Sequence, residues 1–170
     1  MKNEEVTNSI STNLSFMLDN EVFATNVENV LEILEVKPIT KVPKSPEYIK
    51  GVINLRGSVL PVVDLKKVFG LPPVEIKEDT CIIVLSVDID GEQITLGALV
   101  DAVSEVLEIA SDTIEPAPSI GNKYNANFIQ GMWKKDEDFI MLLNVNNVFA
   151  REELSVIQES GEEQLVPAEA

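Results

Sequence analysis

The sequence contains two diverged copies of one unit, and this repeat limits the possible folds more than any other feature. A shift of 73 residues aligns the N-terminal half of the unit with its second copy, and a shift of 80 residues aligns the C-terminal half. Neither half needs an internal gap. The matched pairs are Tyr48–Gly51 with Phe128–Gly131, Val68-Phe69 with Val148-Phe149, Val27-Glu28 with Val100-Asp101, and Leu34-Glu35 with Leu107-Glu108. The seven-residue difference predicts a longer loop in the second copy, around residues 112–127. Each copy is too short to bury a generous core alone, so we expect the two to share one.

Both copies are patterned mainly as β-strands. Alternating residues over 14–18 and 22–24 predict two strands joined at Asp19-Asn20-Glu21, and apolar runs on either side of Asp90-Gly91 predict a hairpin. Residues 59–63 and 139–145 are further strand candidates, and Pro61 predicts a sheet edge or strand end because it cannot donate to a ladder. Residues 30–36 and 64–69 are the two candidate helices, and Asp64 could cap the start of the second. The expected structure is mostly β with short helices.

Both ends of the chain are expected to be loose. Residues 1–12 are polar without a sustained pattern, which predicts a disordered N-terminal tail before a domain at 13–150. Residues 151–170 contain six glutamates and one arginine; Leu154 and Ile157 allow a short helix there, followed by a solvated acidic tail.

Composition argues against most catalytic and membrane functions. The chain has no His, a single Cys81 and a net charge of −16, so imidazole catalysis and an internal disulfide are excluded and nucleic-acid binding is not expected. No apolar stretch suits a signal peptide or a membrane span, and we expect a cytoplasmic protein without direct membrane insertion. The Ser86–Gly91 stretch resembles the start of a calcium loop, but its twelfth position is Gly97 rather than Glu, so no metal or cofactor is expected. A small β enzyme that uses carboxylates alone is a remote alternative.

Arg56 is the residue that composition explains least. It lies between apolar strands in a chain with one other arginine, Arg151, and the aligned residue of the second copy is Asp136. It could form an ordinary surface ion pair, or it could be a positioned fork that pairs with a carboxylate and shapes an interaction surface. Sequence spacing leaves both readings open.

The run YIKGVINLRGSVLPVVDL, at residues 48–65, resembles the signature of the CheW family of bacterial chemotaxis coupling proteins. The resemblance extends over residues 14–149 and includes Val30–Ile33, Thr80 before the strand at 81–85, and Pro-Ala-Pro at 116–118. It implies a mainly β fold of two SH3-like five-stranded β-barrels that share a hydrophobic core, with short helices and no catalytic activity.

The resemblance also implies partners and site residues. Family members couple the cytoplasmic tip of transmembrane chemoreceptors to the regulatory domain of a histidine kinase, within arrays at the inner face of the membrane. The same module in a chemosensory pathway that controls pili or gene expression is the alternative. Arg56 and Glu32 match functionally important family positions and are expected to pair. The other expected partner-binding residues are Val30, Ile33, Gly51, Asn54, Leu55, Gly57 and Thr80.

Overall fold

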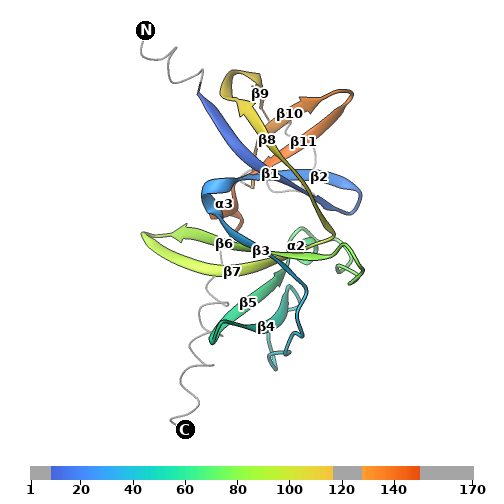
Figure 1. Cartoon of the computed structure of the whole chain (residues 1–170), viewed down its shortest axis with the longest axis vertical. Helices are drawn as coiled ribbons and strands as arrows, with labels where there is room; N and C mark the ends of the chain where they lie inside the picture. Colours follow the sequence, from blue (N-terminus) through green and yellow to red (C-terminus); the bar gives the residue numbers. More distant parts are fainter. Residues whose placement is uncertain (1–8, 117–127, 150–170) are drawn as a thin grey trace.

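The computed structural model describes residues 9–116 and 128–149, and within them two curled β-sheets lie one above the other (Figure 1). The sheet of the first barrel has the strand order β3 (Val30–Glu35), β6 (Cys81–Ile89), β7 (Glu92–Val100), β5 (Ser58–Asp64) and β4 (Ile49–Leu55). The sheet of the second barrel has the order β8 (Ala102–Ala110), β1 (Ile10–Leu18), β2 (Glu21–Asn26), β11 (Asp138–Leu143), β10 (Ile129–Lys135) and β9 (Ile114–Glu115). The short helices are η1 (Val27–Asn29), α2 (Leu65–Val68), η2 (Ser111–Thr113) and α3 (Val145–Val148).

The two copies of the repeat exchange their hairpins. The β1–β2 hairpin precedes the first copy in sequence but pairs with β8 and β11, which belong to the second. The β6–β7 hairpin pairs in return with β3 and β5 of the first copy. Each barrel therefore combines strands of one copy with the hairpin that precedes the other copy, which makes the two barrels structurally interdependent.

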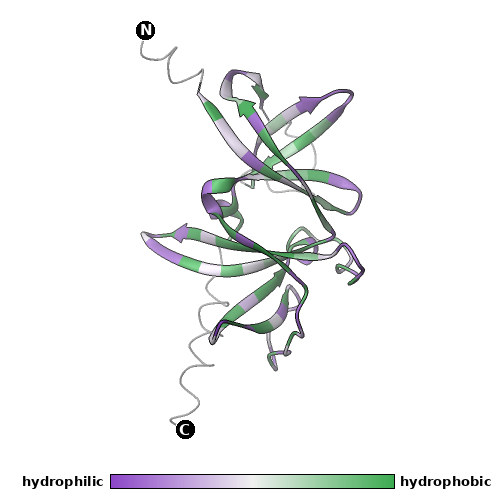
Figure 2. Cartoon of the chain, in the orientation of Figure 1, coloured by the Kyte–Doolittle hydropathy of each residue, from purple (hydrophilic) through white to green (hydrophobic). Residues whose placement is uncertain are grey.

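Three apolar clusters result from this arrangement. One lies inside each barrel, around Ile82 and Leu99 in the first and around Ile109 and Leu142 in the second. The third and largest joins the barrels and includes Phe16 and Phe23 of the β1–β2 hairpin, whose strands contain hydrophobic stretches in Figure 2. The Phe23 and Phe69 rings stack across the junction with centroids 5.8 Å apart. The expected SH3-like architecture with a shared core is confirmed.

The internal repeat is visible in the details of both barrels. A β-bulge lies next to Gly51 in β4 and next to Gly131 in β10. Asp64 caps α2 and Asn144 caps α3, in the same position after β5 and β11. The two-residue strand β9 pairs with Met132 and Trp133, and its counterpart in the first barrel is an isolated bridge from Thr40 to Val52. The second sheet therefore has six strands rather than the expected five.

Three local expectations were wrong. Residues 30–35 form strand β3 rather than a helix, because the nearly continuous apolar run alternates between half-buried and exposed side chains. Pro61 lies in an interior strand; the parallel pairing of β5 with β7 begins only at Val62, so no ladder bond needs the missing N–H. Strand β1 begins at Ile10, inside the stretch assigned to the N-terminal tail, because residues 10–12 pair with β8. The expected helix and acidic tail at 151–170 lie outside the described residues.

Candidate protein interaction surface

Arg56 lies at the tip of the β4–β5 hairpin, in a turn whose backbone is closely defined. Arg56 and Gly57 form a two-residue connection and have φ angles of +50° and +88°, as a type I′ turn requires. The side chain of Asn54 supports the turn, since its Oδ1 accepts a hydrogen bond of 2.7 Å from the Gly57 N–H. The hairpin therefore presents the Arg56 side chain from a fixed backbone.

The Arg56 guanidinium pairs with Glu32 of β3. Nη1 donates to Oε1 over 3.4 Å and Nη2 donates to Oε2, so the pair uses both prongs of the fork. The hydrogen bond from Arg56 to Glu32, followed by the attraction between their charges, raises the pKa of Arg56 above its ordinary value. The Arg56 side chain is 69% exposed and that of Glu32 is 31% exposed, so the pair lies at the surface. Of the two readings that the sequence left open, this geometry favours the positioned fork.

Exposed apolar side chains accompany this ion pair. Leu31 and Ile33, which flank Glu32 on β3, are 55% and 44% exposed. Val59, which follows the Arg56 turn on β5, is 50% exposed. Successive side chains of a strand point to opposite faces, so Leu31 and Ile33 lie on the other face of β3 from Glu32. We call the part of the first barrel that contains Arg56, Glu32, Leu31, Ile33 and Val59 the Arg56 surface. Its mixture of apolar side chains and an oriented ion pair is typical of a protein-binding surface.

The other expected site residues support the structure around this surface. Val30 packs against the shared core, and Leu55 packs against the core of the first barrel. Gly51 has a φ of +149°, and a Cβ there would lie 2.2 Å from the carbonyl oxygen of Thr40. Gly57 has open space around it and is needed for its positive φ alone.

Thr80 lies apart from the Arg56 surface. It precedes β6, and Glu32 pairs further along that strand with Val84, about 10 Å beyond Cys81 at ~3.3 Å per residue. The Thr80 hydroxyl donates to the Glu75 carbonyl and accepts from the Lys77 N–H at 2.7 Å. Its side chain is buried, which indicates that it holds the loop before β6.

The second barrel has a counterpart of the Arg56 surface that sequence reasoning missed. Lys135, next to the β10–β11 turn, forms an ion pair with Glu105 of β8, the residue aligned with Glu32. Val106 and Phe139, aligned with Ile33 and Val59, are 60% and 45% exposed. The repeat alignment contained this signal, but the mismatch of Arg56 with Asp136 concealed it, because the cation has moved by one residue.

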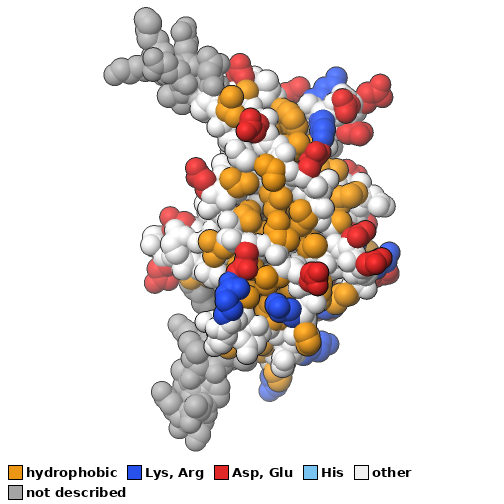
Figure 3. All heavy atoms as spheres, in the orientation of Figure 1, with side chains coloured by type: hydrophobic (Ala, Val, Ile, Leu, Met, Phe, Trp, Pro, Cys, Tyr) orange, Lys and Arg blue, Asp and Glu red, His pale blue; other side chains and the backbone are white. Residues whose placement is uncertain are grey.

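The face drawn in Figure 3 has apolar side chains gathered along its middle, across the junction of the barrels, with most of the charged side chains toward its margins.

A second feature near the junction is an open pocket of about 790 Å³ that contains Asp19, Asp101 and Lys66. The buried Lys66 Nζ lies 3.9 Å from Asp19 and 3.8 Å from Asp101, so it ties α2 to both the β1–β2 turn and the start of β8. Within residues 9–116 and 128–149 there is no cluster of three or more potential metal ligands, and no helix there is long and apolar enough to cross a membrane.

Comparison with known proteins gives consistent matches. The family model described as a CheW-like domain matches residues 13–153. The probable chemotaxis protein CheW of Rhizobium etli is 35% identical over 140 residues, which are 82% of this chain and 88% of the relative. Chemotaxis protein CheW of Thermotoga maritima is 34% identical over 143 residues, 84% of this chain and 89% of the relative. The crystal structure of the scaffolding protein TtCheW from Thermoanaerobacter tengcongensis matches with a TM-score of 0.73 and 34% identity, over 85% of this chain and 91% of that one.

Proposed function

The chain belongs to the CheW-like family of chemotaxis scaffold proteins, and on that premise we propose that it couples chemoreceptors to a histidine kinase without catalysing a reaction itself. In this role, receptor signals control autophosphorylation of the kinase through contacts made by the scaffold. The observation that carries the proposal is the exposed, two-pronged Arg56–Glu32 pair, which is held by a rigid turn on strands that also expose apolar side chains.

Two partners need two contact regions, and the fold supplies more than one. The Arg56 surface lies on the first barrel, and its counterpart around Lys135 and Glu105 lies on the second. The apolar strip in Figure 3 crosses the junction and suits the apolar face of a helix, as in helix-in-groove recognition. We assign the regulatory domain of the kinase to a barrel surface and the helical cytoplasmic tip of the receptor to the junction. Binding to both would recruit the protein to receptor arrays at the inner face of the membrane.

The test is a calorimetric titration of this protein with the regulatory domain of the histidine kinase from the same organism, repeated with a receptor cytoplasmic fragment present. Saturable binding to both partners is expected. Arg56→Glu places two carboxylates together and should weaken one of the two contacts by roughly tenfold or more. Lys135→Glu is the matched control, because it makes the same kind of change on the second barrel.

The pair of variants also assigns each contact to a barrel. If Arg56→Glu and Lys135→Glu weaken different contacts, each barrel serves its own partner, and the assignment of the receptor tip to the junction is wrong. Equal, small effects of both variants on both contacts would overturn the role of the Arg56 surface. No binding of the folded wild-type chain to either partner would overturn the proposed function.

The two alternatives predict different results. In a chemosensory pathway that controls pili or gene expression, the scaffold would bind the kinase and receptor of that pathway instead. A carboxylate enzyme needs an apolar pocket that holds two close carboxyl groups. Asp19 and Asp101 do share a pocket, but Lys66 lies between them and the lining is largely charged, which favours a structural ion cluster.

A further inference from the structure

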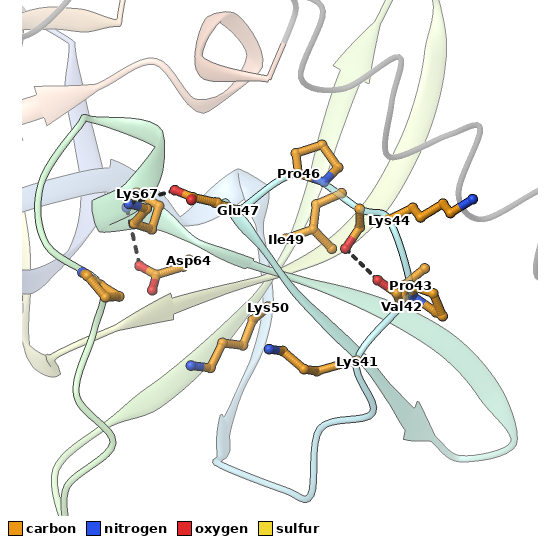
Figure 4. Close-up of a pocket in the computed structure, with 12 residues that line it drawn as sticks. Lys41, Val42, Pro43, Lys44, Pro46, Glu47, Ile49, Lys50, Asp64 and Lys67 are labelled. Carbon is orange, nitrogen blue, oxygen red and sulfur yellow. Dashed lines mark hydrogen bonds and ion pairs between the residues drawn. The ribbon is translucent and has the colours of Figure 1, made fainter.

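Beside α2 lies a pocket with an unusual charge for this protein. The chain has 13 Lys and Arg against 29 Asp and Glu, yet four lysines line one pocket of about 590 Å³. They are Lys41, Lys44, Lys50 and Lys67, and Figure 4 shows Lys41 and Lys50 ending in one region of the pocket, with Lys67 beside Glu47 and Asp64 in another. Such a concentration of positive charge in an acidic protein requires an explanation.

The acidic groups of the pocket leave most of this charge unpaired. Glu47 pairs with Lys67 over 3.1 Å. Asp64 is buried and its carboxylate accepts from the backbone N–H groups of α2 and of Val74. Among the described residues, Lys41, Lys44 and Lys50 have no carboxylate within ion-pair distance. Lys41 and Lys50 are therefore available to one anionic ligand, whereas Lys44 points away from them (Figure 4).

The loop that presents these lysines is held in one conformation. Thr40 is bonded to Val52 through both of its backbone groups, and the Ser45 hydroxyl donates to the Val42 carbonyl. Lys44 has a φ of +64° in this turn, between Pro43 and Pro46. A rigid loop loses little conformational entropy on binding, which favours a specific ligand over loose ion attraction.

The pocket adjoins the partly covered edge of an outer strand, and this favours a peptide over a small anion. Strand β4, which contributes Ile49 and Lys50 to the lining, is the outer strand of its sheet; its edge is covered where Thr40 pairs with Val52 and where the Ile49 N–H donates to the Pro46 carbonyl. Extended peptides add to such edges through their backbones, while pockets beside the edge select side chains. Val42 and the three prolines of the pocket supply apolar contact area.

From these observations we propose that the lysine pocket binds an extended acidic segment of a partner protein, with Glu or Asp side chains on Lys41 and Lys50. This site is separate from the Arg56 surface and goes beyond the proposed coupling function. A membrane surface would need a favourable overall charge, whereas this chain has a net charge of −16.

The test uses the full chain and a fluorescein-labelled peptide of about ten residues in which Glu alternates with Thr, so that the acidic side chains share one face. Fluorescence polarisation should show saturable binding that weakens as the ionic strength rises from about 0.05 M to about 0.5 M. The same peptide with Gln in place of Glu should bind at least tenfold more weakly.

Two double variants with equal charge locate the site. Lys41→Gln with Lys50→Gln should weaken peptide binding roughly tenfold, whereas Lys77→Gln with Lys134→Gln should change it less than about twofold. Equal losses for both variants, or equal affinity for the Glu and Gln peptides, would overturn the proposal. So would binding to anionic phospholipid vesicles with no binding to the peptide.

The chain's own acidic segment is a further arm of the test. A full-length variant with Gln at Glu152, Glu153, Glu159, Glu162 and Glu163 should bind the peptide with unchanged affinity. A gain in affinity would mean that this segment competes for the pocket within the same chain, which would overturn the assignment to a separate partner. Because the readout is the labelled peptide, failure here leaves the kinase and receptor titrations unaffected.

Discussion

Arg56 occupies a backbone position that suits other residues better. A φ of +50° costs an ordinary L-residue about 1 kcal/mol, and Asn-Gly is the preferred pair for a type I′ turn. The Arg56–Glu32 pair is exposed and screened by solvent, so it returns little folding stability. Folding stability therefore does not explain an arginine at this position, whereas binding of a partner to the guanidinium would explain it.

This reasoning gives a prediction for Arg56→Asn. The free energy of unfolding should stay the same or rise by up to about 1 kcal/mol, because Asn accepts the turn conformation at lower cost. Affinity for the partner of the Arg56 surface should nevertheless fall. Urea unfolding and calorimetric titration measure the two quantities on the same sample. A loss of more than about 1 kcal/mol in stability would instead give Arg56 a structural role.

Gly51 and Gly57 should respond differently to the same change. At Gly51→Ala the new Cβ meets backbone 2.2 Å away, at the Thr40 carbonyl oxygen, so strand β4 and the Thr40 segment must separate. We expect a loss of about 3 kcal/mol or more in unfolding free energy. Gly57→Ala has open space and should lose only about 1 kcal/mol from its positive φ. Equal losses in urea titrations would contradict the close approach at Gly51.

At the scale of single elements, Asp64 does more than cap a one-turn helix. Its carboxylate accepts from Lys66 N and Lys67 N of α2, and also from the N–H of buried Val74 at 2.9 Å. The side chain of its counterpart Asn144 accepts a hydrogen bond from the Asn147 N–H and has no second bond of the Val74 kind among the described residues. The first copy of the repeat thus uses its cap to fix the chain after the helix as well.

Asp64→Ala should therefore cost more than Asn144→Ala. We expect about 3 kcal/mol for Asp64, since a buried N–H loses its partner, and about 1 kcal/mol for Asn144. Asp64→Asn keeps one acceptor oxygen and should fall between the two. Denaturant unfolding of the three variants tests the order, and an equal cost for the two alanine variants would show that the Val74 bond contributes little.

The elements that could be predicted from the sequence are those whose signals are local. Asp19-Asn20 and Asp90-Gly91 predicted hairpins and have the expected positive φ values, and Asp64 predicted the start of α2. Residues 30–35 were ambiguous because their near-continuous apolar run suits a helix as well as a strand. The Arg56–Glu32 contact joins residues 24 positions apart and followed from the family resemblance, not from spacing. The lysine pocket depends on tertiary structure that brings Lys67 into the same pocket as Lys41 and Lys50.

The exchange of hairpins determines how the whole molecule responds to a destabilising substitution. Phe23 lies on a strand of the second barrel, and it stacks on Phe69, which follows α2 of the first copy. Lys66 adds an ion cluster across the same junction. If one barrel unfolds, the other loses an exchanged hairpin or one face of the shared core. The molecule should therefore unfold as one unit.

Two probes test this cooperativity. Trp133, the single tryptophan, reports on β10 of the second barrel by its fluorescence, and the rate at which the Cys81 thiol is labelled reports on β6 of the first. Phe69→Ala removes packing from the shared core and should lower the unfolding free energy by about 3–5 kcal/mol. Both probes should still report one transition with the same midpoint, because the loss falls on contacts that each barrel needs.

Ile82→Ala and Ile109→Ala are the matched controls, since each leaves a cavity inside one barrel only. Two independent barrels would respond separately: Ile82→Ala would move the Cys81 transition and leave that of Trp133 in place, and Ile109→Ala would do the reverse. With exchanged hairpins, each variant should move both transitions by the same amount, because β6 and β1 are covalently part of the copy that builds the opposite barrel. Separate midpoints in either control would mean that the shared core couples the barrels more weakly than its packing implies.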